Sequence, residues 1–231
     1  MIFEQLFDEK SSTYTYIIAS GEGREALIID PVIEHSNEYS TILKNLDLKL
    51  VKVIDTHIHA DHISALNELN KRTNCIRVMG EKSKSEVVDL RIKDGEKIKI
   101  ENVIVQAIYT PGHTDCSYSF LMDDRVFTGD TLLINGSGRT DFQNGNAHDA
   151  YDSIFNKLLT LPEKTLVYPA HDYNGKKFST IENEKNNNPR LQVSSKEEYA
   201  DIMNNLNLAN PKMMDVAVPA NVKGFTLDNI N

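Results

Sequence analysis

The sequence has no tryptophan, only two cysteines and no long apolar run. Cys75 and Cys116 are too few for a disulfide framework, so we expect the fold to rely on its hydrophobic core. No apolar stretch reaches the roughly 20 residues that a membrane-spanning helix needs. The N-terminus has neither a basic region nor a long apolar region, so the sequence predicts no secretion signal. We therefore expect a cytoplasmic protein that does not use a membrane as a partner.

Positive charge is also scarce in this chain. The 25 lysines and arginines are outnumbered by 34 aspartates and glutamates, which gives a formal net charge of −9. Such an acidic chain is a poor partner for nucleic acid or for an anionic membrane surface. It can still bind an anionic small molecule if cations gather in one pocket. With 231 residues, 40% of them hydrophobic, the chain is long enough for one sizeable core.

The most informative stretch is His-Ile-His-Ala-Asp-His at residues 57–62. Residues 50–55 before it are apolar and β-branched and predict a buried strand, whereas residues 63–69 after it have helical spacing. The stretch therefore lies at a strand-to-helix turn, where its side chains can converge. One histidine alone would more simply be a surface residue. Three histidines and an aspartate within six positions instead predict a zinc or iron site, made by His57, His59, Asp61 and His62.

Three later residues with metal-binding capacity stand in a similar setting. His113, Asp130 and His171 each follow a predicted strand and a turn that contains glycine or proline. Ligands from several strand ends can meet at one edge of a sheet. We therefore expect these three side chains beside the first four. The remaining histidines, His35 and His148, are expected at the surface.

The predicted strands fall into two groups separated along the chain. We expect the tail beyond residue 206 to be irregular because it contains Pro211 and Pro219. The predicted strands cover 13–19, 25–30, 50–55, 76–80, 97–100, 103–109, 117–121, 125–128 and 165–168, and the predicted helices cover 36–47, 63–69, 149–161 and 195–206.

The order of the motifs, from residues 57–62 through His113 and Asp130 to His171, resembles the metallo-β-lactamase superfamily. The resemblance covers about 115 residues. It implies an α/β fold, the αββα sandwich, with a metal in a cleft at one edge of two sheets. We expect residues 1–231 to form a single domain of this kind, with a short C-terminal extension from about residue 190.

A second set of motifs resembles one particular family within this superfamily. Residues 136–143 (GSGRTDFQ), 171–173 (HDY) and 188–191 (NPRL) resemble the persulfide dioxygenases of the ethylmalonic-encephalopathy protein type, as does the run 206–221. The glyoxalase II hydrolases share the metal motif but usually differ after the Gly-Arg pair and have a longer helical C-terminal domain. Ser137 departs from the family, because many members have a cysteine there. A thiol role at that position is therefore absent from this chain.

The resemblance implies an iron(II)-dependent enzyme that converts glutathione persulfide, O2 and water to sulfite and glutathione. It implies one Fe(II) per chain, bound by His57, His113 and Asp130, and suggests a homodimer. Two histidines and one carboxylate leave coordination positions open on iron for sulfur and O2. The other candidates would orient these ligands or hold a second metal: His59, Asp61, His62 and His171.

The ligands by themselves leave other functions open. The same seven residues could bind two zinc ions and activate a hydroxide, as in a glyoxalase II-like hydrolase of S-acyl glutathione thioesters. A third alternative is a non-catalytic protein that binds a metal or a persulfide. Metal identity therefore rests on the resemblance.

The substrate-binding candidates follow from the charge of glutathione, which has two carboxylates. Arg139 and Arg190 are predicted to bind them, since arginine grips a carboxylate with two parallel hydrogen bonds. Tyr173 is predicted to donate its hydroxyl to the peptide part. Arg139 has the alternative of a structural ion pair with Asp141. Cys116 is interpreted as a packing residue, with an oxidisable thiol beside the metal as the alternative.

Overall fold

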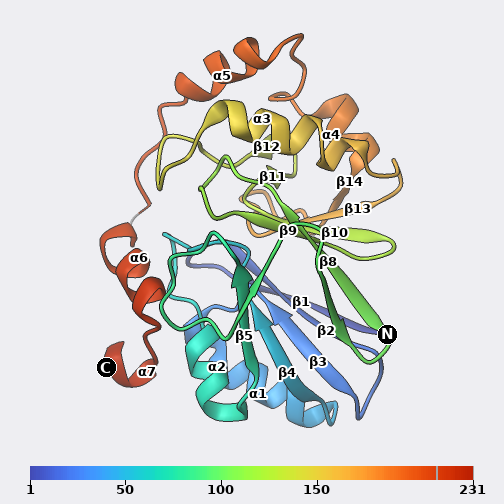
Figure 1. Ribbon diagram of the computed structural model, residues 1–231, viewed down its shortest axis with the longest axis vertical. Coiled ribbons are helices and arrows are strands. Elements are labelled where there is room, and N and C mark those ends of the chain that lie inside the picture. The colour runs from blue at the N-terminus through green and yellow to red at the C-terminus, as the bar shows by residue number, and fades with distance from the viewer. Residues whose placement is uncertain (212, 231) are drawn as a thin grey trace.

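Two six-stranded sheets stack face to face, with helices on both outer sides (Figure 1). The computed structural model describes residues 1–211 and 213–230. This layered arrangement confirms the predicted αββα sandwich. None of the helices in those residues is both long and apolar enough to span a membrane.

The first sheet has its strands in sequence order. The second strand of this sheet, TYTYIIA, is buried at every position because one face packs on the other sheet and the opposite face on helices α1 (Ser36–Asn45) and α2 (Leu66–Thr73). Strands three to six pair in parallel, which directs their carboxyl ends to one edge. The strands are β1 (Ile2–Asp8), β2 (Thr13–Ala19), β3 (Glu25–Ile29), β4 (Lys49–Ile54), β5 (Ile76–Gly80) and β6 (Leu90–Ile92).

The second sheet has the order β14-β13-β10-β9-β8-β7. Its outer face is covered by α3 (Ala147–Phe155) and α4 (Ile181–Asn187), and α5 (Lys196–Asn204) packs on α3 (Figure 1). A small two-stranded sheet, β11 (Leu132–Leu133) and β12 (Gly136–Ser137), lies after β10 in the chain. The strands of the large sheet are β7 (Lys97–Ile100), β8 (Val103–Tyr109), β9 (Tyr118–Leu121), β10 (Arg125–Gly129), β13 (Leu166–Pro169) and β14 (Ser179–Thr180).

Aromatic side chains join the two sheets. The ring centroids of Tyr16 on β2 and Phe127 on β10 are 4.8 Å apart, and those of Phe3 and Tyr168 are 5.0 Å apart. Tyr16 and Phe127 are each 1% exposed. Such pairs contribute about 1 kcal/mol each beyond the apolar area that they bury. This layer therefore holds the sheets in one relative position.

The C-terminal tail is more regular than the sequence indicates. The expected irregular tail is wrong, because α6 (Met214–Lys223) and α7 (Leu227–Ile230) lie there, and α6 continues through Pro219. Ala217 and Ala220 on α6 are fully buried in the core, and this packing outweighs the local cost of the proline. Strands β1, β6 and β14 and helix α4 are also unforeseen. Lys212 and Asn231 lie outside the described residues, and the extent of the domain stays a prediction.

Asn221 on α6 holds the turn that carries the histidine motif. Its Oδ1 accepts a hydrogen bond from the backbone nitrogen of Ser64 at 2.8 Å. Its Nδ2 donates to the backbone oxygens of His59 and His62, both at 2.9 Å. The side chain is buried, so these bonds form away from water. The tail therefore contributes directly to the shape of the turn.

We expect Asn221→Leu to lower the free energy of unfolding by about 3 kcal/mol, because it leaves buried backbone groups without partners. Urea denaturation followed by circular dichroism measures this change. The control is Asn204→Leu, at an exposed position of α5, which should change the free energy by less than about 0.5 kcal/mol. Equal losses in the two variants would contradict the role assigned to Asn221.

Candidate metal centre

His57 is oriented by a short chain of hydrogen bonds from the end of β3. Asp30 Oδ1 accepts from the backbone nitrogen of Thr56 at 2.7 Å, and Asp30 Oδ2 accepts from the Thr56 hydroxyl at 3.0 Å. The hydroxyl oxygen lies 2.9 Å from His57 Nδ1. Since its proton goes to Asp30, this oxygen accepts the Nδ1 proton, and Nε2 keeps a free lone pair. Burial, together with His59 and His113, lowers the pKa of His57 well below its usual value, so its imidazole is neutral.

His113 is fixed in the same way from the second sheet. It lies between β8 and β9, and its Nδ1 donates to the backbone oxygen of Arg139 at 2.8 Å. Its Nε2 is therefore the nitrogen that remains for a metal. Gly138 is required beside it, because a Cβ there would lie 2.0 Å from the backbone oxygen of Asp130 and 2.9 Å from His113 Nδ1.

Asp130 follows β10 and supplies a carboxylate. Its Oδ1 lies 2.6 Å from His171 Nδ1, and its Oδ2 lies 3.5 Å from His113 Nε2. Burial alone would raise the pKa of Asp130, but the charge and hydrogen bond of His171, with His113 and His57, lower it. The carboxylate is therefore ionised and can act as a metal ligand.

The structure brings His57, His113 and Asp130 together. One ligand atom from each residue lies within 4.8 Å of the others. His57 is 1% exposed and His113 is 9% exposed, so the group is shielded from bulk water. Two imidazole nitrogens and one carboxylate oxygen on one side leave the other side open to the adjacent cavity. This donor set fits iron(II) and also fits zinc.

A second group consists of His59, Asp61 and His62, whose ligand atoms also lie within 4.8 Å of one another. His59 Nε2 contacts Asp30 Oδ1 at 3.1 Å, and His62 Nδ1 contacts Asp61 Oδ2 at 2.7 Å. His59 Nδ1 and His62 Nε2 are buried and have no hydrogen-bond partner among the described residues. The geometry of this group therefore retains the capacity for a second metal.

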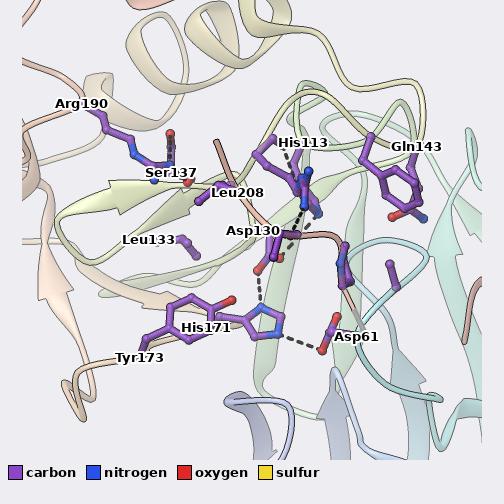
Figure 2. A pocket seen from close by; sticks show the side chains of 16 residues that line it. Asp61, His113, Asp130, Leu133, Ser137, Gln143, His171, Tyr173, Arg190 and Leu208 are labelled. Atoms are coloured by element: carbon purple, nitrogen blue, oxygen red, sulfur yellow. Dashed lines mark hydrogen bonds and ion pairs between the residues drawn. The ribbon is translucent and has the colours of Figure 1, made fainter. Parts of the chain in front are cut away.

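His171 lies between the two groups and belongs to neither. Its Nδ1 contacts Asp130 at 2.6 Å and its Nε2 contacts Asp61 at 2.9 Å, as the dashed lines in Figure 2 show. Burial alone would lower the pKa of His171, but the two carboxylates raise it well above its usual value. With both nitrogens bonded to carboxylates, His171 supports the ligands in this arrangement and offers no free lone pair.

A cavity of about 390 Å³ opens beside the first group. In Figure 2, Arg190 and Tyr173 lie on one side of it and Gln143 on the other, with His113 and Asp130 between them. The wall contributed by the C-terminal segment was not foreseen from the sequence. That wall consists of Leu208, Ala209 and Pro211.

Arg190 and Tyr173 both reach this cavity. Arg190 Nη1 donates to the backbone oxygen of Ser137, and no carboxylate pairs with Arg190 among the described residues. Burial lowers the pKa of the guanidinium, as expected for a cation without an acidic partner. Tyr173 is 71% exposed, and its ring stacks on His171 with the centroids 6.0 Å apart.

Arg139 forms the ion pair that the sequence left as an alternative. Its Nε and Nη2 donate to the two oxygens of Asp141 at 2.7 and 2.8 Å. Its Nη1 donates to the backbone oxygen of Ala209 at 2.7 Å, which ties the C-terminal segment to the cavity. Cys116 is 3% exposed and lies in the core cluster with the helices of the first sheet, in agreement with a packing residue.

Comparisons with known proteins agree with this geometry. The family model of the metallo-beta-lactamase superfamily matches residues 9–171. Persulfide dioxygenase ETHE1, mitochondrial, of Mus musculus is 43% identical over 226 residues, which are 96% of this chain and 88% of the mouse protein. The crystal structure of ETHE1 from Myxococcus xanthus superposes with a TM-score of 0.94 at 49% identity and covers 96% of this chain and 98% of that chain.

A hydrolase relative is less similar. The hydroxyacylglutathione hydrolase of Dictyostelium discoideum is 30% identical over 185 residues, which are 75% of this chain and 68% of the hydrolase. The comparisons also correct one expectation: the predicted cytoplasmic location is contradicted, because the mouse relative is named as mitochondrial. Together, the matched motifs and the fold show that the chain belongs to the persulfide dioxygenase family of the metallo-β-lactamase superfamily.

Proposed function

We propose that this protein is an iron(II)-dependent dioxygenase that oxidises glutathione persulfide. The group of His57, His113 and Asp130 beside the cavity is the observation that carries the proposal. One persulfide, one O2 and one water give one sulfite, one glutathione and two protons. The outer sulfur loses four electrons, and the two oxygen atoms of O2 gain them. The similarity to persulfide dioxygenases favours this reaction over the alternatives.

His57 Nε2, His113 Nε2 and Asp130 Oδ2 would hold the iron. Bound there, iron(II) would offer open positions for both sulfur and O2 and would pass electrons from the sulfur to O2. Zinc has no redox chemistry and could not pass these electrons. The protein orients the ligands: the Thr56 hydroxyl holds His57, and the Arg139 carbonyl holds His113, each through Nδ1. His171 holds Asp130 through Oδ1, which would leave Oδ2 for the iron.

The proposed substrate contacts lie in the cavity. Arg190 would bind a carboxylate of glutathione, because it is half-buried and lacks an acidic partner among the described residues. The Tyr173 hydroxyl would donate to the peptide part. Arg139 remains a candidate for the second carboxylate, although its guanidinium already pairs with Asp141. O2 as the co-substrate and a homodimer as the assembly stay predictions.

One observation favours a second candidate function. The free nitrogens of His59 and His62 beside Asp61 offer a second metal position, as a dizinc hydrolase of S-acyl glutathione thioesters requires. The similarity to a hydroxyacylglutathione hydrolase points in the same direction at lower identity. Metal analysis separates the two functions.

Protein purified without added metal should contain about one iron per chain by elemental analysis. Removal of the iron by a chelator should abolish oxygen uptake with fresh glutathione persulfide, and Fe(II) should restore it whereas Zn(II) should not. An oxygen electrode measures the uptake. About two zinc ions per chain, with hydrolysis of S-lactoylglutathione, would instead establish the hydrolase.

Ligand substitutions test the proposed division of the histidines. We expect His113→Ala and Asp130→Ala to lose the iron and to reduce oxygen uptake by at least about 1,000-fold, because each removes a direct ligand. His59→Ala should keep a measurable part of the iron, since His59 would act through Asp30. His148→Ala is the control, at an exposed position of α3. If His59→Ala loses the metal as completely as His57→Ala, the single-iron assignment is wrong.

Arg190→Gln should raise the KM for glutathione persulfide about tenfold, because it removes a charge-assisted contact to a carboxylate. Its kcat should change less than about twofold, since Arg190 lies away from the reacting sulfur. Steady-state oxygen uptake gives both constants. Arg24→Gln, at a side chain that is 64% exposed in the turn between β2 and β3, is the control. An unchanged KM in Arg190→Gln would exclude this contact.

A further inference from the structure

Asn188 is a fully buried residue that contacts Arg190 directly. It follows α4 and begins the motif at residues 188–191. Its Oδ1 accepts from the backbone nitrogen of Arg190 at 3.0 Å, and its Nδ2 donates to the backbone oxygen of Gly136 in β12 at 2.9 Å. None of the proposed metal ligands or substrate contacts is Asn188, so its side chain still lacks an assigned role.

The two contacts of Asn188 close a ring that includes the guanidinium of Arg190. Arg190 Nη1 donates to the backbone oxygen of Ser137, the neighbour of Gly136 in β12. Figure 2 shows the guanidinium beside Ser137 at the wall of the cavity. Arg190 is therefore held at both ends: its backbone nitrogen is bound to Asn188, and its guanidinium is bound to the strand that Asn188 also holds.

A carboxylate fixes the orientation of the Asn188 amide. Nδ2 also donates to Glu184 Oε2 at 2.8 Å, so its two hydrogens face two acceptors, this carboxylate and the Gly136 carbonyl. Exchange of the amide nitrogen and oxygen would place Oδ1 against both acceptors and would leave the backbone nitrogen of Arg190 facing a donor. Oδ1 therefore faces Arg190 in the arrangement that satisfies the whole amide.

Glu184 is a firm anchor for Asn188 because three other donors also bind it. Its Oε1 accepts from Ser179 Oγ at 2.5 Å and from Asn183 Nδ2 at 3.1 Å, and its Oε2 accepts from the backbone nitrogen of Asn135 at 2.8 Å. The Glu184 side chain is fully buried, and these bonds replace the water that a buried carboxylate loses. They hold α4 against β14 and against the turn before β12.

We propose that Asn188 is a positioning residue that presents the guanidinium of Arg190 to a carboxylate of the substrate. An arginine that is already oriented loses less conformational freedom when it binds, and its planar group keeps further N–H donors for the ligand. Ligands that have a carboxylate should therefore depend on Asn188, whereas ligands without one should not. The inference rests on the contact between Arg190 and glutathione in the proposed function.

A double-mutant cycle on oxygen uptake by the iron-loaded enzyme tests this role. Arg190→Gln should raise the KM for glutathione persulfide about tenfold and Asn188→Ala about fivefold, with kcat changed less than about twofold. The double variant should have the KM of Arg190→Gln alone, because Asn188 acts through that residue. A KM raised about fiftyfold, the product of the single effects, would show independent roles and would overturn the inference.

Thr180→Ala is the matched control for a weaker α4. The Thr180 hydroxyl caps this helix by accepting from the backbone nitrogen of Asn183 at 3.0 Å. Its loss should lower the urea midpoint of unfolding but change the KM less than about twofold. If Thr180→Ala raises the KM as much as Asn188→Ala does, general weakening of the helix explains the result and the inference is wrong.

Calorimetry separates this inference from the proposed reaction. Asn188→Ala should bind glutathione about fivefold more weakly than the unmodified holoenzyme, and glutathione diethyl ester with less than about twofold change. Equal losses for the two ligands would overturn the role of Asn188. Absence of oxygen uptake with glutathione persulfide in the unmodified holoenzyme would instead contradict the proposed function, and the calorimetric comparison would still test Asn188.

A crystal structure of the unmodified holoenzyme with glutathione requires no variant to fold. The guanidinium of Arg190 should keep its bond to the Ser137 carbonyl while other N–H groups bind the glutathione carboxylate. A guanidinium that leaves Ser137 to reach the carboxylate would overturn the inference. Glutathione bound with both carboxylates away from Arg190 would contradict the substrate contact in the proposed function, and with it the inference.

Discussion

A chain of hydrogen bonds from Asp130 through His171 to Asp61 joins the two sheets at the edge where the metal centre lies. Asp130 and His171 follow strands of the second sheet, whereas Asp61 lies in the turn after β4 of the first sheet. A buried carboxylate is stable only when a donor or a cation faces it, and His171 faces two of them. A backbone hydrogen bond also joins the two sheets here: the Tyr14 nitrogen donates to the Ala170 oxygen at 2.7 Å. The sheets must therefore stack in one register for these groups to be satisfied.

Hydrogen bonds to neighbouring groups also orient the metal ligands themselves. Each residue of the first group presents one atom to the centre and has another atom bonded elsewhere: His57 to Thr56, His113 to the carbonyl of Arg139, and Asp130 to His171. Such outer contacts fix the tautomer and the direction of a ligand before a metal binds. The second group is bonded in a similar way, with His59 bonded to Asp30, His62 to Thr13 and Asp61 to His171.

The proposed substrate is an anion, and the cavity of this acidic protein offers it a local positive charge. The chain has a net charge of −9, but Arg190 lies half-buried at the cavity without an acidic partner among the described residues. A cation in such a place attracts a carboxylate more strongly than a solvated lysine would. By contrast, the Arg139 guanidinium already donates hydrogen bonds to Asp141 and to the Ala209 carbonyl of the C-terminal segment. Two arginines that the sequence predicts to bind the same substrate thus have different surroundings.

The sequence by itself determined the strands with a strong periodic pattern and the residues able to bind a metal. The predicted strand at 13–19 coincides with β2, and the motif at 57–62 lies at the predicted turn, because both depend on short-range spacing. Tertiary packing determined that the α6 segment is helical, because burial of its alanines offsets the cost of Pro219 within the helix. It also decided the partners of Arg139, Asn221 and Gln143. The Gln143 bond to Ile58 spans 85 residues and the Asn221 bond to His59 spans 162. Contacts at such separations exist only in the packed tertiary structure, where α6 lies against the first sheet.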